Sequence, residues 1–245
     1  MRITSIHLIL VIVVHMDLEL YQMDVRTTFL SGELNEKIYI DQPLGFKIKG
    51  QERKVCKLKR SIYSLEQACR QCNVKFHQTI LKNGFTMMEE DHCVYLKLSN
   101  NNFIIVSLYV DNILIAGNSK EMIDTTKRWL SSNFEMKDMG EANYVLGVKI
   151  IRDRATKLLG LTQETYIKKT LERYHMQDSK PMDTNVDKSL SLSLNICPKT
   201  LEEKEKMFKV LYTSVINSLI YAMMCTRLDI CYVIGLVSRY QSNPG

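Results

Sequence analysis

The sequence predicts an α+β fold in which antiparallel strand pairs alternate with amphipathic helices. Two apolar runs rich in β-branched residues flank a tight turn at 109–112, and this pattern predicts a β-hairpin over 103–117. Apolar residues recur at near-helical spacing over 61–83 and 120–134. Hairpins and helices mixed along one chain are typical of the α+β class.

The N-terminal segment to about Leu20 is apolar, and we expect it to be helical. Residues 21–30 predict a strand that carries Asp24 near its end and stops at Ser31 and Gly32. Residues 33–55 are rich in turn formers, and they predict short strands joined by a surface loop.

Asn83 and Gly84 end the helix predicted over 61–83. The later predicted elements are a strand at 93–98, the hairpin, the helix at 120–134, a second hairpin at 144–151 and 158–161, a helix at 163–173, and helical segments over 208–240. Residues 177–205 lack any such pattern and predict a linker.

Composition predicts a globular protein with a buried core. The chain has 245 residues, of which 45% are apolar and 24% charged, enough for one substantial domain or two small ones. The net charge of +6 is concentrated in residues 47–75, which hold nine basic side chains against two acidic ones. Such a cluster is either a solvated surface or a strip that binds polyanions.

Seven cysteines without a regular framework favour a reducing, intracellular setting. Cys69 and Cys72, with His92 and Cys93 downstream, could be drawn as a zinc site, but no second Cys-x-x-Cys pair completes it. We therefore expect free thiols.

The apolar run at 8–14 is too short to span a bilayer, which takes about 20 residues. Charged residues follow it directly and no small-residue cleavage site is present, so we expect neither a signal peptide nor a membrane segment.

Two carboxylates predict a candidate metal site. Asp24 stands near the end of one predicted strand and Asp111 in the hairpin turn, so the two can converge. Magnesium prefers oxygen ligands, and nucleotidyl transfer uses two divalent cations roughly 3.5 to 4 Å apart. Each aspartate taken alone would more often be an ordinary turn residue.

Further ordered segments give these aspartates a context. They are QMDVRTTFL at 22–30, SGEL at 31–34, VCKL at 55–58, SIY at 61–63, LYVD at 108–111, MKDMG at 136–140, LG at 146–147, TRLDI at 226–230 and SRY at 238–240. Together they cover nearly the whole chain, which resembles the reverse transcriptases of copia-type retrotransposons.

The resemblance implies a right-hand polymerase within a Pol polyprotein. The expected regions are a palm with partial fingers at 1–155, a thumb-like start at 156–176, a linker at 177–206 and the start of a connection or RNase H region at 207–245.

The resemblance also assigns the metal site. Asp24 and Asp111 would be the catalytic ligands of two Mg²⁺ ions, with the backbone carbonyl of Val25 as an auxiliary ligand. Asn112 occupies the position of a third carboxylate.

A primer-template of RNA or DNA and a deoxynucleoside triphosphate are the implied partners, and no stable protein partner is inferred. The implied nucleotide-binding residues are Phe29, Ser64, Gln67 and Arg70, and the implied nucleic-acid contacts are Tyr109, Lys54, Lys57, Lys59 and Arg60. Without the resemblance, Phe29 would be a core residue, Tyr109 an ordinary half-buried strand residue and Arg70 part of a helix surface.

Several departures from the family pattern predict an impaired or inactive enzyme. Asn112 removes a negative charge from the metal site, Ser64 replaces a glycine, and Glu66 replaces a lysine beside the substrate. The basic fingers strands are expected upstream of Met1, so we do not expect Asn112→Asp alone to restore activity. The alternatives are a weak polymerase supported by Mn²⁺ and a non-catalytic remnant that binds nucleic acid.

Overall fold

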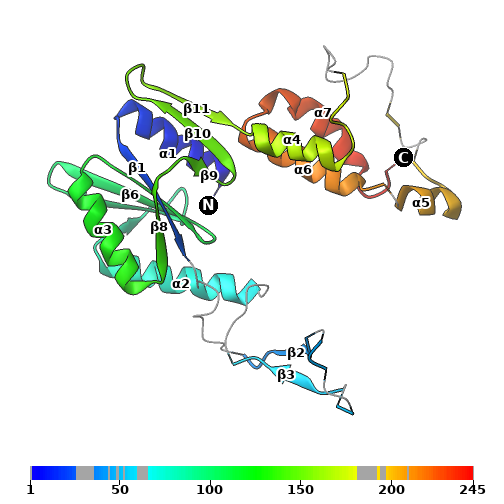
Figure 1. Ribbon diagram of the computed structural model, residues 1–245, viewed down its shortest axis with the longest axis horizontal. Helices are drawn as coiled ribbons and strands as arrows, with labels where there is room; N and C mark the ends of the chain where they lie inside the picture. Colours follow the sequence, from blue (N-terminus) through cyan, green and yellow to red (C-terminus); the bar gives the residue numbers. More distant parts are fainter. Residues whose placement is uncertain are drawn as a thin grey trace. The chain divides into compact units, whose positions relative to one another are not determined.

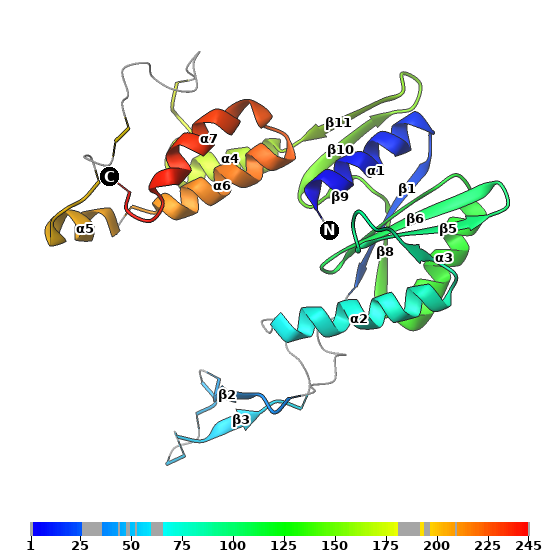
Figure 2. The ribbon, with the colours of Figure 1, turned by 180° about the vertical axis from the view of Figure 1, so that it is seen from behind.

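The computed structural model describes most of the chain, and it separates into two compact units. The described residues are 2–25, 36–43, 45–47, 50–51, 53–59, 66–180, 192–193, 197–208 and 210–244, with only the backbone for 66–72 and 204. The first unit comprises Met1–Ala142 and Arg154–Lys157, and the second Asn143–Asp153 and Leu158–Gly245 (Figures 1 and 2). Each unit is described by itself below.

The first unit is built on a six-stranded sheet in the order β4-β5-β6-β7-β1-β8. Its strands are β1 (Glu19–Val25), β4 (Thr86–Met87), β5 (Val94–Ser99), β6 (Asn102–Tyr109), β7 (Asn112–Gly117) and β8 (Met136–Glu141). Every neighbouring pair is antiparallel, which confirms the α+β class and the hairpin predicted over 103–117. Strand β8 was not predicted as an element.

One face of the sheet packs against α2 (Glu66–Lys82) and α3 (Lys120–Asn133). The core between them contains Phe76 and Ile80 from α2, with Ile123 and Leu130 from α3. The strands contribute alternate residues, which are Met23, Val25, Ile104, Val106, Leu108, Ile113 and Ile115. Both helices were predicted from the helical spacing of their apolar residues, and the structure confirms that each buries one face.

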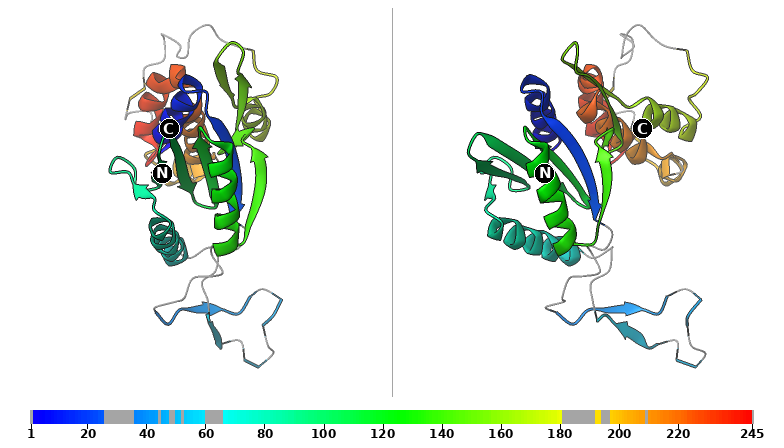
Figure 3. Two further views of the ribbon diagram at one scale, coloured as in Figure 1. Left: turned by 90° about the vertical axis from the view of Figure 1, so that its left-hand side faces the viewer. Right: turned by 60° about the vertical axis from the view of Figure 1, so that its left-hand side comes forward.

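The opposite face of the sheet is covered in part by α1 (Ile3–His15) (Figure 3). Its buried residues are Ile6, Ile9, Leu10 and Val13. On this face the strands also bury apolar side chains where α1 lies. These residues alternate along the strands with those of the core against α2 and α3, and they are Leu20, Ile105, Leu114 and Ala116. Further along β1 the same face carries Gln22 and Asp24, which are only half-buried. The apolar cover therefore gives way to a polar end of the sheet.

Asp91 holds the N-terminus of α1. Its carboxylate accepts hydrogen bonds from the Arg2 N–H at 2.9 Å, the Ser5 hydroxyl at 2.7 Å and the Cys93 N–H at 3.0 Å. Partial burial raises the pKa of Asp91, but these hydrogen bonds outweigh it, and the pKa lies below its ordinary value. An anion at a helix N-terminus also interacts favourably with the helix dipole.

We expect Asp91→Asn to lower the stability of the protein at neutral pH and to have little effect in acid. A carboxyl whose pKa is depressed by folding contributes stability above its unfolded pKa, and this contribution is lost as the pH falls through the folded value. Urea unfolding of both proteins at pH 7 and pH 3 measures the difference. An equal difference at the two pH values would contradict the assignment.

Strands β2 (Tyr39–Asp41) and β3 (Val55–Lys57) form a separate two-stranded ribbon. They pair antiparallel, with Tyr39 opposite Lys57 and Asp41 opposite Val55. The ribbon confirms the short strands predicted in this part of the chain, while residues 33–35, 44, 48, 49 and 52 lie outside the described residues.

The second unit combines a three-stranded sheet with helices. Its elements are β9 (Tyr144–Val145), β10 (Val148–Asp153), β11 (Leu158–Thr162), α4 (Glu164–Arg173), α5 (Leu201–Phe208), α6 (Tyr212–Cys225) and α7 (Cys231–Val237). The Tyr166 ring of α4 packs edge-on against Tyr221 of α6, with centroids 4.8 Å apart. The Tyr221 hydroxyl donates to the carbonyl of Leu146, so the sheet and the helices form one unit. The structure therefore has two compact units, whereas the resemblance implied four regions. The assignment of those regions to palm, thumb, linker and connection remains a prediction.

Helix α5 begins inside the segment predicted to be a linker. Thr200 and Glu203 form a capping box: the Glu203 N–H donates to the Thr200 hydroxyl at 3.2 Å, and the Glu203 carboxylate accepts from the Thr200 N–H at 3.0 Å. The Thr-x-x-Glu spacing was present in the sequence and could have predicted this helix start.

The five cysteines that the structure describes with side chains are free thiols. None of the described helices is alone long and apolar enough to cross a bilayer, although α5 and α6 together, bent by 47°, have the length and composition for it.

Candidate active site

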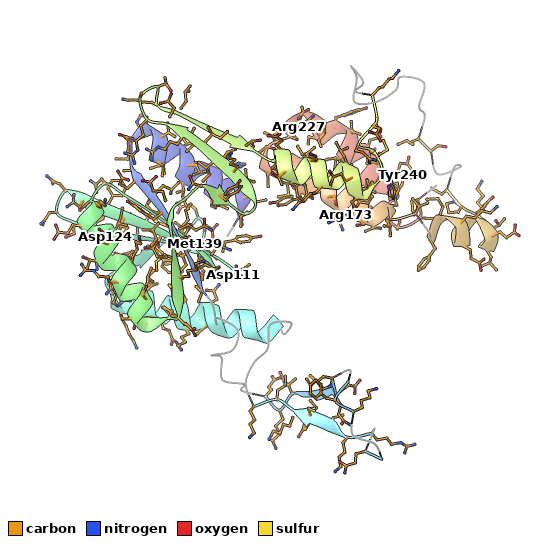
Figure 4. The ribbon with its side chains drawn as sticks, in the orientation of Figure 1. Asp111, Asp124, Met139, Arg173, Arg227 and Tyr240 are labelled. Carbon is orange, nitrogen blue, oxygen red and sulfur yellow. The ribbon has the colours of Figure 1, made fainter. Side chains whose placement is uncertain are left out.

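The hairpin between β6 and β7 turns through only two residues, Val110 and Asp111 (Figure 4). Tyr109 pairs with Asn112 across the turn. Val110 has a φ of +55°, in the left-handed region that few residues other than glycine adopt, while Asp111 is not among the residues with positive φ. A β-branched residue in this conformation is strained, because its side chain crowds the backbone.

We expect Val110→Asn to stabilise the first unit by about 1 kcal/mol, because asparagine tolerates left-handed backbone. Val110 is 51% exposed, so little apolar burial is lost. Thermal or urea unfolding measures the change. Val74→Asn is the matched control, since Val74 is 43% exposed in α2 and has no positive φ. Stabilisation by both substitutions, or by neither, would contradict the strain at Val110.

Strand pairing brings the predicted metal ligands to one end of the sheet. Asp24 lies directly opposite Asn112 in the β1–β7 register. The Val25 N–H donates to the Asp111 carbonyl at 2.8 Å, which fixes the hairpin turn against the end of β1. Residues far apart in the sequence, Asp24 and Asp111, are therefore neighbours.

A chain of hydrogen bonds links Asn112 to both sides of this site. The Gln22 Nε2 group donates to Asn112 Oδ1 at 2.8 Å, and Asn112 Nδ2 donates to Asp111 Oδ1 at 2.9 Å. The amide thus uses its oxygen on Gln22 and its N–H on the neighbouring carboxylate. A carboxylate at position 112 could not make the second bond.

Gln22 lies in the QMDVRTTFL segment, but no role was predicted for it from the sequence. Side chains alternate along a strand, so Gln22 and Asp24 share one face, while Met23 between them is fully buried in the core. This spacing was the available signal, although the partner 90 residues away could not be inferred from it.

The donor set fits a hard divalent cation in kind but is incomplete in charge. Carboxylate oxygens of Asp24 and Asp111 are the ligands that Mg²⁺ prefers, and the Asn112 oxygen is neutral. Among the described residues, no group of three His, Cys, Asp or Glu side chains could hold a metal ion. The structure does not describe the side chains of Cys69 and Cys72, so it does not test the zinc site drawn from the sequence.

The other predicted site residues fall into three groups. Tyr109 is half-buried and joins the Asp24 site through its pairing with Asn112. Lys54, Lys57 and Lys59 are exposed on or beside the β2–β3 ribbon. The remaining predictions have undescribed side chains: Phe29, Ser64 and Arg60 lie outside the described residues, and Gln67 and Arg70 have only their backbone placed on α2.

The sequence of the chain matches a known protein family. The family model described as "Reverse transcriptase (RNA-dependent DNA polymerase)" matches residues 1–188. This match covers more than half of the chain, so the chain belongs to the reverse transcriptase family.

Its relatives then specify the branch as the copia-type retrotransposons. The chain is 47% identical over its full length to the "Retrovirus-related Pol polyprotein from transposon TNT 1-94" of Nicotiana tabacum, and 33% identical over 98% of its length to that "from transposon RE1" of Arabidopsis thaliana. It spans 18% and 16% of these polyproteins. No solved structure matches the chain.

Proposed function

We propose that the chain forms the palm of a copia-type RNA-directed DNA polymerase whose metal site is impaired. The observation that supports this most directly is the pairing of Asp24 with Asn112 beside Asp111. In the proposed site, Asp24, Asp111 and the Val25 carbonyl hold the cations, while the neutral Asn112 oxygen accepts a hydrogen bond from Gln22.

The bound cations would activate a primer hydroxyl and stabilise the departing pyrophosphate. The chain's own contribution is to hold the two carboxylates at the rigid end of a sheet. Met23 and Ile113 are fully buried beside Asp24 and Asn112, so the backbone that carries the site is fixed by the core.

The substitution at position 112 supports impairment for an electrostatic reason. Replacing a carboxylate by an amide removes one negative charge from a site that must attract divalent cations. In addition, Asp111 Oδ1 already accepts a hydrogen bond from Asn112, which competes with metal coordination at that oxygen.

A second candidate function is non-catalytic binding of nucleic acid. The exposed lysines Lys54, Lys57 and Lys59 favour it, because phosphate contacts dominate nucleic-acid affinity whether or not the metal site works.

Primer extension tests the proposal. We expect the chain to bind an RNA–DNA primer-template with salt-dependent affinity and to incorporate little or no nucleotide with Mg²⁺. Any incorporation with Mn²⁺ should disappear in Asp24→Ala and persist in Asp124→Ala, a control on α3. Efficient Mg²⁺-dependent extension that survives Asp24→Ala would overturn the assigned site, and efficient extension lost in Asp24→Ala would overturn the impairment alone.

A further inference from the structure

The β2–β3 ribbon has one face that combines an aromatic ring with lysines. Tyr39 lies directly opposite Lys57, so their side chains share a face. The Leu58 N–H donates to the Ile38 carbonyl at 2.9 Å, so the antiparallel pairing continues one residue beyond the strands.

Continuing this register from the Tyr39–Lys57 pair by two residues on each strand places Lys37 opposite Lys59. Both are exposed, and both lie two residues from the Tyr39–Lys57 pair, on the same face. The residues between them, Ile38 and Leu58, are only partly exposed. The ribbon therefore has an apolar side and a side that carries Tyr39 among three lysines.

A second aromatic ring lies on the loop that follows β2. Phe46 is 77% exposed, and Tyr39 is 54% exposed. The Phe46 N–H donates to the Pro43 carbonyl at 3.0 Å, across a turn in which Gly45 has a φ of +86°. The positive φ favours glycine at this position, and the backbone hydrogen bond fixes the turn that carries Phe46.

The loop around these rings is tied to the ribbon by a buried amide. Gln42 is 9% exposed, and its Nε2 group donates to the carbonyls of Gln51 at 2.7 Å and Lys54 at 2.9 Å. Both hydrogen bonds satisfy backbone groups that a short ribbon could not pair by itself. The two exposed rings are thus carried on organised backbone.

Charge identifies the kind of partner. Residues 36–59 contain seven basic side chains and three acidic ones. Exposed aromatic rings beside a basic track are the features that bind single-stranded nucleic acid, because unpaired bases stack on the rings while phosphates contact the cations. Paired bases in a duplex keep their faces stacked on one another and leave the rings without a partner.

We propose that the β2–β3 ribbon and the loop after β2 bind single-stranded nucleic acid, with bases on Tyr39 and Phe46 and phosphates on Lys37, Lys57 and Lys59. The inference rests on the proposed function only for the class of partner, and it adds a binding site and a preference for unpaired strands. Asp41 lies on the same face at the opposite end from Lys37, so it opposes the binding.

Fluorescence anisotropy with the full chain, in EDTA, tests this site without the metal. The probes are a labelled oligothymidine and a duplex of equal length. We expect tighter binding to the single strand, and a loss of about tenfold in affinity for Tyr39→Ala and for Phe46→Ala. Tyr39→Phe should bind as the unmodified chain does. Asp41→Asn should bind more tightly, and Lys57→Gln should reduce the slope of log affinity against log salt by about 0.7.

Two controls match these substitutions. Tyr232→Ala removes a ring that is 76% exposed on α7, and Lys168→Gln removes an exposed charge on α4; neither should change the affinity. Unchanged binding in both Tyr39→Ala and Phe46→Ala, or equal affinity for duplex and single strand, overturns the proposal. If primer extension shows no role for Asp24 while the ring substitutions still weaken binding, the proposed function fails and this site stands.

Discussion

Asn112→Asp is expected to destabilise the metal-free protein by about 1 to 3 kcal/mol and to strengthen divalent-cation binding by about tenfold or more. The substitution removes the N–H group that donates to Asp111 Oδ1 at 2.9 Å and places a second carboxylate beside that of Asp111. Without a cation they repel each other, and with one they become joint ligands.

Thermal unfolding in EDTA and with Mn²⁺, together with titration calorimetry of Mn²⁺, measures both effects. We expect the midpoint of Asn112→Asp to fall below that of the unmodified chain in EDTA and to recover when Mn²⁺ is added. Asn101→Asp is the control, since it adds the same charge at an exposed position on the turn between β5 and β6. Equal behaviour of the two variants would show that Asn112 does not lie in a cation site.

Ile113→Ala is expected to lower the free energy of unfolding by about 2 to 5 kcal/mol. Ile113 is fully buried in the core between the sheet and helices α2 and α3, and it pairs with Met23 on one side and Leu108 on the other. Truncation removes apolar contacts and leaves a cavity that a central strand cannot close.

Urea unfolding followed by circular dichroism measures this loss. Leu98→Ala is the matched control, because Leu98 is 71% exposed on β5 and its truncation should cost less than about 0.5 kcal/mol. Comparable losses at both positions would contradict the burial pattern of the sheet. We also expect Ile113→Ala to weaken Mn²⁺ binding in Asn112→Asp, since residues 112 and 113 are carried on one strand.

Local patterns predicted most of the elements. The strands of the hairpin are continuous apolar runs because both faces of the sheet are covered there. Helix α1 covers one face, and α2 and α3 cover the other, so polar and apolar residues do not alternate. The helices at 120–134 and 163–173 were predicted to within a residue at either end, since the polar and apolar faces of each are distinct.

The pairing of strands that are distant in the sequence could not be predicted from local patterns. Strand β8 carries Met136, Asp138 and Glu141 with no clear alternation, and it forms because β1 supplies partners for its backbone. The neighbourhood of Asp24 and Asp111 was predicted from the resemblance and from the chemistry of paired carboxylates. The bond from Gln22 to Asn112 depends on a register that only the folded sheet defines.

The position of β1 in the sheet sets a condition on the order of folding. Both of its neighbours, β7 and β8, come much later in the chain, and the Gln22–Asn112 hydrogen bond spans 90 residues. During synthesis β1 must therefore wait, with Met23 and Val25 uncovered, until the hairpin has emerged from the ribosome. Pairings of this kind close slowly and expose apolar strand to aggregation in the interval. The candidate site thus cannot form before β7 has been synthesised.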